Sequence, residues 1–206
     1  YPDGAGDAVK SALARALPLP EGAALVLGNG SDELIQVITS AIARPGACVL
    51  APDPTFVMYR IYAMQAHVRY ASVPLHADFT LDVEALVAEI ARQKPALVWL
   101  ASPNNPTGRA IPAAAIERVL AAAPGLVVVD EAYADFAGTT LVPRVLEFPN
   151  LVVMRTLSKV GLAGARLGYA VGHPAWIGEL DKVRSPYNVN ALTQAVVPVV
   201  LGAADA

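Results

Sequence analysis

Lys159, Arg166 and Asp130 follow apolar runs that predict strands. The first two lie in "RTLSKVGLAGAR", and Asp130 closes "LVVVD". A lysine flanked by apolar residues is readily desolvated, which lowers its pKa and makes the amine a nucleophile toward aldehydes. A carboxylate at the end of a buried strand needs a cation or several hydrogen-bond donors, because burying a bare charge is costly. These three groups are therefore candidates for one binding site.

A second candidate is the stretch "GNGSDE", which carries Gly30, Ser31 and Asp32 into a predicted helix. Backbone N–H groups exposed at such a start, together with the helix dipole, favour an anion such as phosphate. The same residues also suit a plain turn followed by a capped helix. The stretch matches neither the Walker pattern nor GxGxxG, which disfavours a nicotinamide-dinucleotide domain.

Two further polar residues follow strand-like runs. Asn105 lies in "SPNNPTG", where the following proline restricts its backbone and directs its side chain. Tyr133 follows Asp130 by three residues and can face the same side if the chain turns there. Each feature has a structural alternative: a turn for Asn105, a helix cap or ion pair for Asp130, and a solvent-exposed position for Lys159 and Arg166.

Taken together, these residues predict one ligand. It needs an aldehyde for Lys159, a phosphate for "GNGSD", "TLS" and Arg166, and a basic ring nitrogen for Asp130. Pyridoxal 5′-phosphate (PLP) has all three groups, and proteins bind it through a lysine Schiff base with an acidic partner at the ring nitrogen.

The elements that must position these residues alternate along the chain. Apolar runs without period-two polarity predict strands, and runs with helical spacing predict helices. This alternation predicts an α/β fold, with three α/β/α layers and a mostly parallel central sheet, and ligands bind at the carboxyl ends of such strands. The expected strands are 47–52, 67–73, 96–102, 126–133, 151–158 and 168–172. The expected helices are 7–17, 31–43, 56–66, 82–93, 112–123, 174–184 and 191–202.

Composition limits the class of protein. The 206 residues carry 15 Lys and Arg against 18 Asp and Glu, a net charge of −3, which disfavours a general nucleic-acid or anionic-membrane surface. Cys48 is the only cysteine and lies in a strand-like run, which favours an inert core thiol and a cytoplasmic location. The three histidines, of which His67 is expected to begin a strand, have no metal-ligand spacing, so no metal site is expected.

Seven ordered stretches resemble the fold-type I PLP-dependent aminotransferases, and among them the histidinol-phosphate aminotransferases. The stretches are "YPD", "GNGSDE", "PTFVMY", "SPNNPTG", "VVVDEAYADF", "RTLSKVGLAGARLGY" and "RSPYNVN". The resemblance implies that residues 1–206 form the large PLP-binding domain, running into an inter-domain helix near 190–206. The family's N-terminal arm and small C-terminal domain would lie outside this sequence.

The resemblance also implies a role for each site residue. Lys159 would bind PLP covalently and later shuttle a proton, and Asp130 would keep the pyridine nitrogen protonated. Tyr133 and Asn105 would hydrogen-bond the ring's phenolic oxygen, and Phe56, where relatives usually have tyrosine, would stack on the ring. The phosphate would be surrounded by Gly30, Ser31, Asp32, Thr156, Ser158 and Arg166, with Tyr1 reaching it from the neighbouring subunit of a homodimer.

The implied activity is transamination between histidinol phosphate and 2-oxoglutarate in histidine biosynthesis. An aromatic aminotransferase and a threonine-phosphate decarboxylase share these motifs and stay open as alternatives. A non-catalytic PLP-binding regulator is an alternative of another class. The loop between Lys159 and Arg166 is one residue shorter than in many relatives, which predicts a tight turn there.

Overall fold

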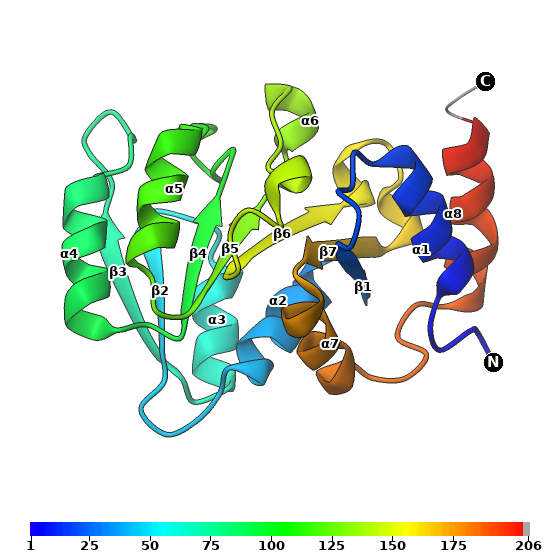
Figure 1. Ribbon diagram of the computed structural model, residues 1–206, viewed down its shortest axis with the longest axis horizontal. Helices are drawn as coiled ribbons and strands as arrows, with labels where there is room; N and C mark the ends of the chain where they lie inside the picture. Colours follow the sequence, from blue (N-terminus) through cyan, green and yellow to red (C-terminus); the bar gives the residue numbers. More distant parts are fainter. Residues whose placement is uncertain (204–206) are drawn as a thin grey trace.

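A seven-stranded sheet forms the centre of the protein in the computed structural model, which describes residues 1–203 (Figure 1). The strand order is β1-β7-β6-β5-β4-β2-β3. All strands run parallel except β7, which is antiparallel to both of its neighbours, β1 and β6. The strands are β1 (Ala24–Asn29), β2 (Cys48–Asp53), β3 (Arg69–Pro74), β4 (Leu97–Ala101), β5 (Leu126–Asp130), β6 (Leu151–Thr156) and β7 (Leu167–Gly172).

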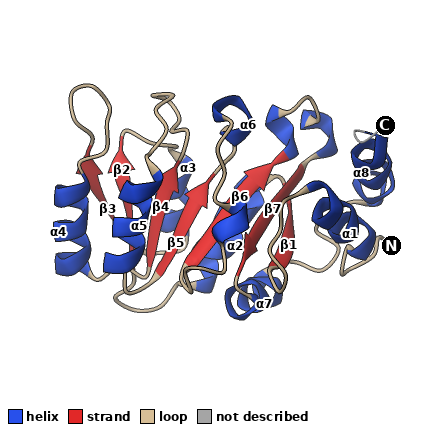
Figure 2. Ribbon diagram, turned by 45° about the horizontal axis from the view of Figure 1, so that its top comes forward, coloured by secondary structure: helices blue, strands red, loops and turns tan. Residues whose placement is uncertain are grey.

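Helices cover both faces of the sheet, so the expected three α/β/α layers are confirmed (Figure 2). Helices α1, α4, α5 and α8 contribute to the core on one face, and α2, α3 and α7 to the core on the other. The helices are α1 (Asp7–Ala16), α2 (Ser31–Ala41), α3 (Met58–Gln65), α4 (Val83–Gln93), α5 (Ala113–Ala122), α6 (Ala134–Ala137), α7 (Pro174–Val183) and α8 (Ala191–Ala203). Short 3₁₀ turns are η1 (Val142–Arg144), η2 (Leu157–Lys159) and η3 (Ala163–Ala165).

The continuous apolar runs form strands because both of their faces are buried. In β4, Val98 and Leu100 join the core beneath α4 and α5, whereas Leu97 and Trp99 join the core beneath α2 and α3. All five residues of β4 are buried. A strand covered on both sides has no solvent-facing positions, and this explains the absence of alternating polar residues.

Three local expectations were wrong. Strand β1 was not expected, and it pairs with β7 along the whole of Ala24–Asn29. His67 does not begin a strand; it has a φ of 54°, and β3 starts at Arg69. The strands expected at 126–133 and 151–158 end at Asp130 and Thr156, because the chain turns there.

The topology brings distant residues to one edge of the sheet. Asp130 ends β5 in register between Ala101 of β4 and Met154 of β6. At the same edge, Asn29 ends β1 opposite Leu167, the first residue of β7. The start of α2 and the turns after β6 therefore lie beside the carboxyl ends of the parallel strands.

The last described helix is α8, whose 13 residues include Pro198. Residues 204–206, the end of the segment expected to run into an inter-domain helix, lie outside the described residues. Within residues 1–203, no helix has both the length and the apolar character needed to cross a membrane.

Gly168 in β7 lets the start of α2 pack directly on the sheet. A Cβ at this position would lie 2.6 Å from both the Gly30 carbonyl carbon and the Ser31 nitrogen. We therefore expect Gly168→Ala to lower the free energy of unfolding by about 1–3 kcal/mol, because backbone atoms must move to accommodate the methyl group. Urea denaturation measures this change.

Gly178→Ala is the matched control. Gly178 is exposed within α7, and a Cβ there meets no atom within 4 Å. This substitution should raise the unfolding free energy by about 0.5–1 kcal/mol, since alanine is the better helix former. Equal stability of the Gly168→Ala protein and the wild type would contradict the packing argument.

Candidate active site

A pocket at the carboxyl edge of the sheet gathers most of the predicted site residues. We call it the edge pocket. It is lined by Ser31, Asp32, Phe56, Tyr59, Ala101, Pro103, Asn105, Asp130, Ala132, Tyr133, Thr156, Ser158, Lys159 and Arg166. Of the predicted residues only Gly30 and Tyr1 are not among them, so segments far apart in the sequence converge on one cavity.

Asp130 is the buried acid of the edge pocket. Its Oδ1 accepts a hydrogen bond from the Ala132 backbone N–H at 3.0 Å, and its Oδ2 accepts one from the Tyr59 hydroxyl at 2.6 Å. Burial raises the pKa of Asp130 from 3.8 to about 6, against the lowering effect of these two donors. Lys159 also lowers this pKa and Asp32 raises it. Among the described residues, the carboxylate therefore has no strong cationic partner.

Tyr59 is a functional candidate that the sequence did not reveal. Its side chain is fully buried, and its ring stacks on Trp99 with centroids 4.6 Å apart and planes 2° from parallel. Burial, followed by the neighbouring Asp130 charge, raises the Tyr59 pKa well above its usual value of 10. The hydroxyl thus keeps its proton and donates it to Asp130 in a hydrogen bond. The signal in the sequence was "PTFVMY", which pointed only to Phe56.

Lys159 lies in the edge pocket, but in a different environment from the one expected. It ends the 3₁₀ turn η2, just after β6, and its side chain is exposed. The expected desolvation of Lys159 is therefore absent in the single chain, because the turn carries the residue to the rim. Its Nζ lies 5.3 Å from the centroid of the Tyr133 ring, at a distance that permits a cation–π contact. Both side chains line the edge pocket together with Asp130.

One end of the edge pocket has the donors of an anion site. Gly30, with a φ of 83°, precedes α2, and no side chain caps this helix, so its first N–H groups have no capping partner. The Arg166 guanidinium occupies the space beside Gly30: a Cβ on Gly30 would lie 2.6 Å from Arg166 Nη2. Arg166 also donates to Ser158 Oγ at 3.4 Å. Helix N–H groups, a hydroxyl and a guanidinium together suit a phosphate.

Arg166 lies at the end of the short connection between β6 and β7. Two 3₁₀ turns, η2 and η3, fill it, and Arg166 itself adopts a left-handed φ of 49°. Thr156 fixes the start of this turn: its hydroxyl accepts from the Ser158 N–H at 3.2 Å and lies 3.2 Å from the Leu167 carbonyl oxygen. The buried Thr156 thereby positions Ser158 in the pocket wall.

The two asparagines of "SPNNPTG" have different environments. Asn104 is buried, donates to the Pro54 carbonyl at 3.0 Å and accepts from the Thr55 hydroxyl at 2.8 Å. These bonds fasten the turn to the loop after β2. Asn105 is half-buried and lines the edge pocket. Asn104 therefore acts as the structural support, and Asn105 is free to face a ligand.

Of the two aromatic residues Phe56 and Tyr1, only Phe56 lines the edge pocket. Phe56 lines it and meets Tyr59 edge-on, with centroids 5.7 Å apart. Tyr1 is fully exposed and packs against Tyr187 with centroids 5.2 Å apart. Tyr1 is thus outside the edge pocket of its own chain.

Comparison with known proteins identifies the family. The whole chain, residues 1–206, matches the family "Aminotransferase class I and II", and the protein belongs to it. It is 54% identical over 210 residues to histidinol-phosphate aminotransferase 1 of Ralstonia nicotianae, covering 100% of this chain and 56% of the relative. It is 55% identical to the histidinol-phosphate aminotransferase of Chromobacterium violaceum, covering 95% and 55%. The chain therefore spans about half the length of these relatives.

A solved structure agrees with this result. The histidinol-phosphate aminotransferase of Sinorhizobium meliloti, determined in complex with pyridoxal-5′-phosphate, superposes with a TM-score of 0.89 at 30% identity. The match covers 100% of this chain and 57% of that chain. The expected α/β fold class is thereby confirmed.

The raised Asp130 pKa predicts a pH-dependent effect of Asp130→Asn on cofactor-free protein. The wild-type carboxyl titrates at about 6 when folded and near 3.8 when unfolded, so its ionisation opposes folding as pH rises through that window. The difference between these two pKa values corresponds to about 3 kcal/mol. This is the largest gain in the free energy of unfolding that Asp130→Asn can give above pH 6. Thermal unfolding of both proteins between roughly pH 3.5 and 7.5, a range that includes both pKa values, measures this gain.

Two observations check this prediction. Below the unfolded-state pKa the gain of Asp130→Asn should disappear, because both forms are then neutral. Tyr59→Phe is the companion variant: it removes a donor to the carboxylate, so it should raise the Asp130 pKa further. A gain that is independent of pH would mean that the charge of Asp130 is not the cause.

Proposed function

We propose that this chain is the large, PLP-binding domain of a histidinol-phosphate aminotransferase. The enzyme would transfer an amino group between L-histidinol phosphate and 2-oxoglutarate, in the histidine-biosynthesis pathway and in the cytoplasm. The observation that carries this proposal is the convergence of Lys159, Asp130 and Arg166 on one pocket in a chain of this family. Identity of 54–55% to relatives bearing that name supports the choice of substrate.

The residues of the edge pocket fit PLP. The Arg166 guanidinium beside Gly30, together with the uncapped start of α2, suits a phosphate dianion. Asp130 lies within the pocket as an acceptor for a ring N–H, and Lys159 supplies the only lysine amine among the residues that line it. Asp32 contributes a backbone N–H to the helix start, whereas its carboxylate would have to point away from the phosphate.

When bound, PLP supplies an aldehyde that condenses with amines and a ring that withdraws electrons. The chain's own residues would orient it and move protons. Asp130 would hold a proton at the ring nitrogen, which the Tyr59 hydroxyl favours by stabilising the carboxylate. Lys159 Nζ would anchor the aldehyde carbon and later take the proton from the substrate's α-carbon.

The remaining residues would fix the orientation of the ring. Tyr133 and Asn105 would donate to its phenolic oxygen, and Phe56 would lie against its face. Gly30, Ser31, Thr156, Ser158 and Arg166 would hold the phosphate. Tyr1, exposed and outside its own chain's pocket, would serve the neighbouring subunit of a homodimer.

The test is an assay of the full-length protein with histidinol phosphate and 2-oxoglutarate, with glutamate as the measured product. Lys159→Ala should abolish the visible absorption band of covalently bound cofactor. It should also lower the turnover rate by roughly 10²–10⁴-fold through loss of proton transfer alone. Lys182→Ala is the control, because Lys182 lies on α7, pairs with Glu179 and is exposed.

Assays of the same protein with other substrates distinguish the alternative activities. Release of CO₂ from threonine phosphate would identify a decarboxylase, and preference for an aromatic amino acid would identify an aromatic aminotransferase. Cofactor binding without any turnover would indicate a regulator. An absorption band that survives Lys159→Ala would remove Lys159 from its assigned role.

A further inference from the structure

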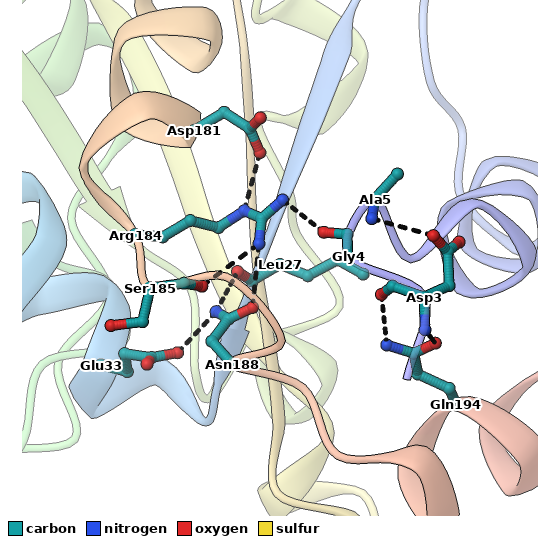
Figure 3. Close-up of polar contacts among 10 residues, drawn as sticks. All are labelled: Asp3, Gly4, Ala5, Leu27, Glu33, Asp181, Arg184, Ser185, Asn188 and Gln194. Atoms are coloured by element: carbon teal, nitrogen blue, oxygen red, sulfur yellow. Dashed lines mark hydrogen bonds and ion pairs between the residues drawn. The ribbon is translucent and has the colours of Figure 1, made fainter. Parts of the chain in front are cut away.

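Arg184 is shielded from solvent, although it lies between two surface segments. Its side chain is 10% exposed, and it uses its donors in three directions (Figure 3). Nε donates to Asp181 Oδ1 at 2.8 Å, Nη2 donates to the Gly4 carbonyl at 2.6 Å, and Nη1 donates to Asn188 Oδ1 at 3.2 Å. Arg184 thereby joins the end of α7, the N-terminal segment and the loop before α8.

Asn188 continues this chain of hydrogen bonds toward α2. Its Nδ2 donates to the Leu27 carbonyl at 3.0 Å and to Glu33 Oε2 at 2.7 Å (Figure 3). Arginine can only donate, and carbonyl and carboxylate oxygens only accept, so the orientation of the Asn188 amide is fixed by its neighbours. The Asn188 amide therefore has one allowed orientation, in which Nδ2 donates a hydrogen bond to the Glu33 carboxylate.

Glu33 connects the network to the proposed phosphate site. Besides Asn188, its Oε2 accepts the backbone N–H of Asn29 at 2.6 Å. Asn29 immediately precedes Gly30, the residue at the N-cap position of α2. Ser31 and Asp32 line the edge pocket but Glu33 does not. The carboxylate thus fixes the loop from outside, where its charge stays away from an anion at the helix start.

We propose that Asn188, itself oriented by Arg184, is a positioning residue for the phosphate end of the edge pocket. It holds Glu33 outside the pocket and keeps the Asn29–Ser31 loop in the shape that presents the first N–H groups of α2. A freed Glu33 would lie in the first turn of the helix that binds the phosphate, where its charge would oppose a dianion. This inference rests on the proposed function, since it assumes that the site binds PLP.

The N-terminal segment is fastened by the same region. Gln194 of α8 donates to the Asp3 carbonyl at 2.8 Å and accepts from the Asp3 N–H at 3.1 Å (Figure 3). Together with the Arg184–Gly4 bond, these contacts tie residues 3–4 to the loop that carries Asn188. The loop therefore has support on both sides, which allows Asn188 to hold its position.

The experiment compares two ligands in the full-length protein: PLP and pyridoxal, which lacks the phosphate. Asn188→Ala should weaken PLP binding about tenfold, the size of one well-placed hydrogen bond, and change pyridoxal binding less than about twofold. Adding Glu33→Gln should restore part of the loss, because the new amide side chain keeps an acceptor for the Asn29 N–H but carries no charge. Dissociation constants by absorbance titration give all values.

Asn150→Ala is the matched structural control. The Asn150 amide also donates to backbone carbonyls, those of Leu120 and Ala123, but it lies outside the edge pocket. Its loss should reduce thermal stability and leave the ratio of the two dissociation constants unchanged. If Asn188→Ala does not fold, Arg184→Gln should show the same selective loss, about threefold, since it removes one of the bonds that orient Asn188.

The outcomes separate the two proposals. Equal weakening of PLP and pyridoxal in the folded variant, or no recovery with Glu33→Gln, would overturn the role of Asn188 while leaving the proposed function intact. A wild-type protein that binds PLP no more tightly than pyridoxal would contradict the proposed function itself.

Discussion

The site depends on a carboxylate that is buried at the end of a central strand. Asp130 has only two direct hydrogen-bond donors among the described residues, the Tyr59 hydroxyl and the Ala132 N–H, and its pKa is raised to about 6. An acid held in this way is unfavourable for the folded chain at neutral pH, and it becomes favourable when a basic ring nitrogen shares its proton. We infer that the fold tolerates this cost because the cofactor offsets it on binding.

The sheet topology determines which residues lie beside Asp130 in the edge pocket. Three parallel strands, β4 to β6, deliver Asn105, Tyr133 and Lys159 through the turns that follow their carboxyl ends. The single reversed strand, β7, has a different function: it starts at the same edge, so Arg166 arrives beside the beginning of α2. The lysine, the acid and the groups proposed to bind phosphate thus come from separate loops at one edge of the sheet.

The sequence predicted much of this arrangement because strand ends carry local signals. Apolar runs followed by "DEAY", "TLSK" or "PNNPTG" indicated both the parallel sheet and the residues at its edge. The pairing of Tyr59 with Asp130 has no such signal, since 71 residues separate the partners and only the packed core brings them together. Likewise, nothing in "VVVDEAY" indicated the partners of Glu131, whose carboxylate accepts from the Leu141 N–H and the Thr140 hydroxyl.

The expected burial of Lys159 was wrong for a related reason. Its apolar neighbours suggested burial, but the chain leaves β6 in a 3₁₀ turn and places the side chain at the exposed rim. Neighbours in the sequence indicate hydrophobicity, whereas exposure depends on the direction of the turn. Strand β1 was not predicted, and its partner, β7, lies more than 130 residues further along the chain.

The central claim is that Asp130 holds a proton at the cofactor's ring nitrogen, and the ¹⁵N chemical shift of ring-labelled PLP bound to the full-length protein tests it most directly. The account predicts a protonated nitrogen in the wild type well above the pH at which the free cofactor loses this proton. It also predicts an unprotonated nitrogen in the Asp130→Asn variant. An unprotonated nitrogen in the wild type, or the same shift in both proteins, would contradict it.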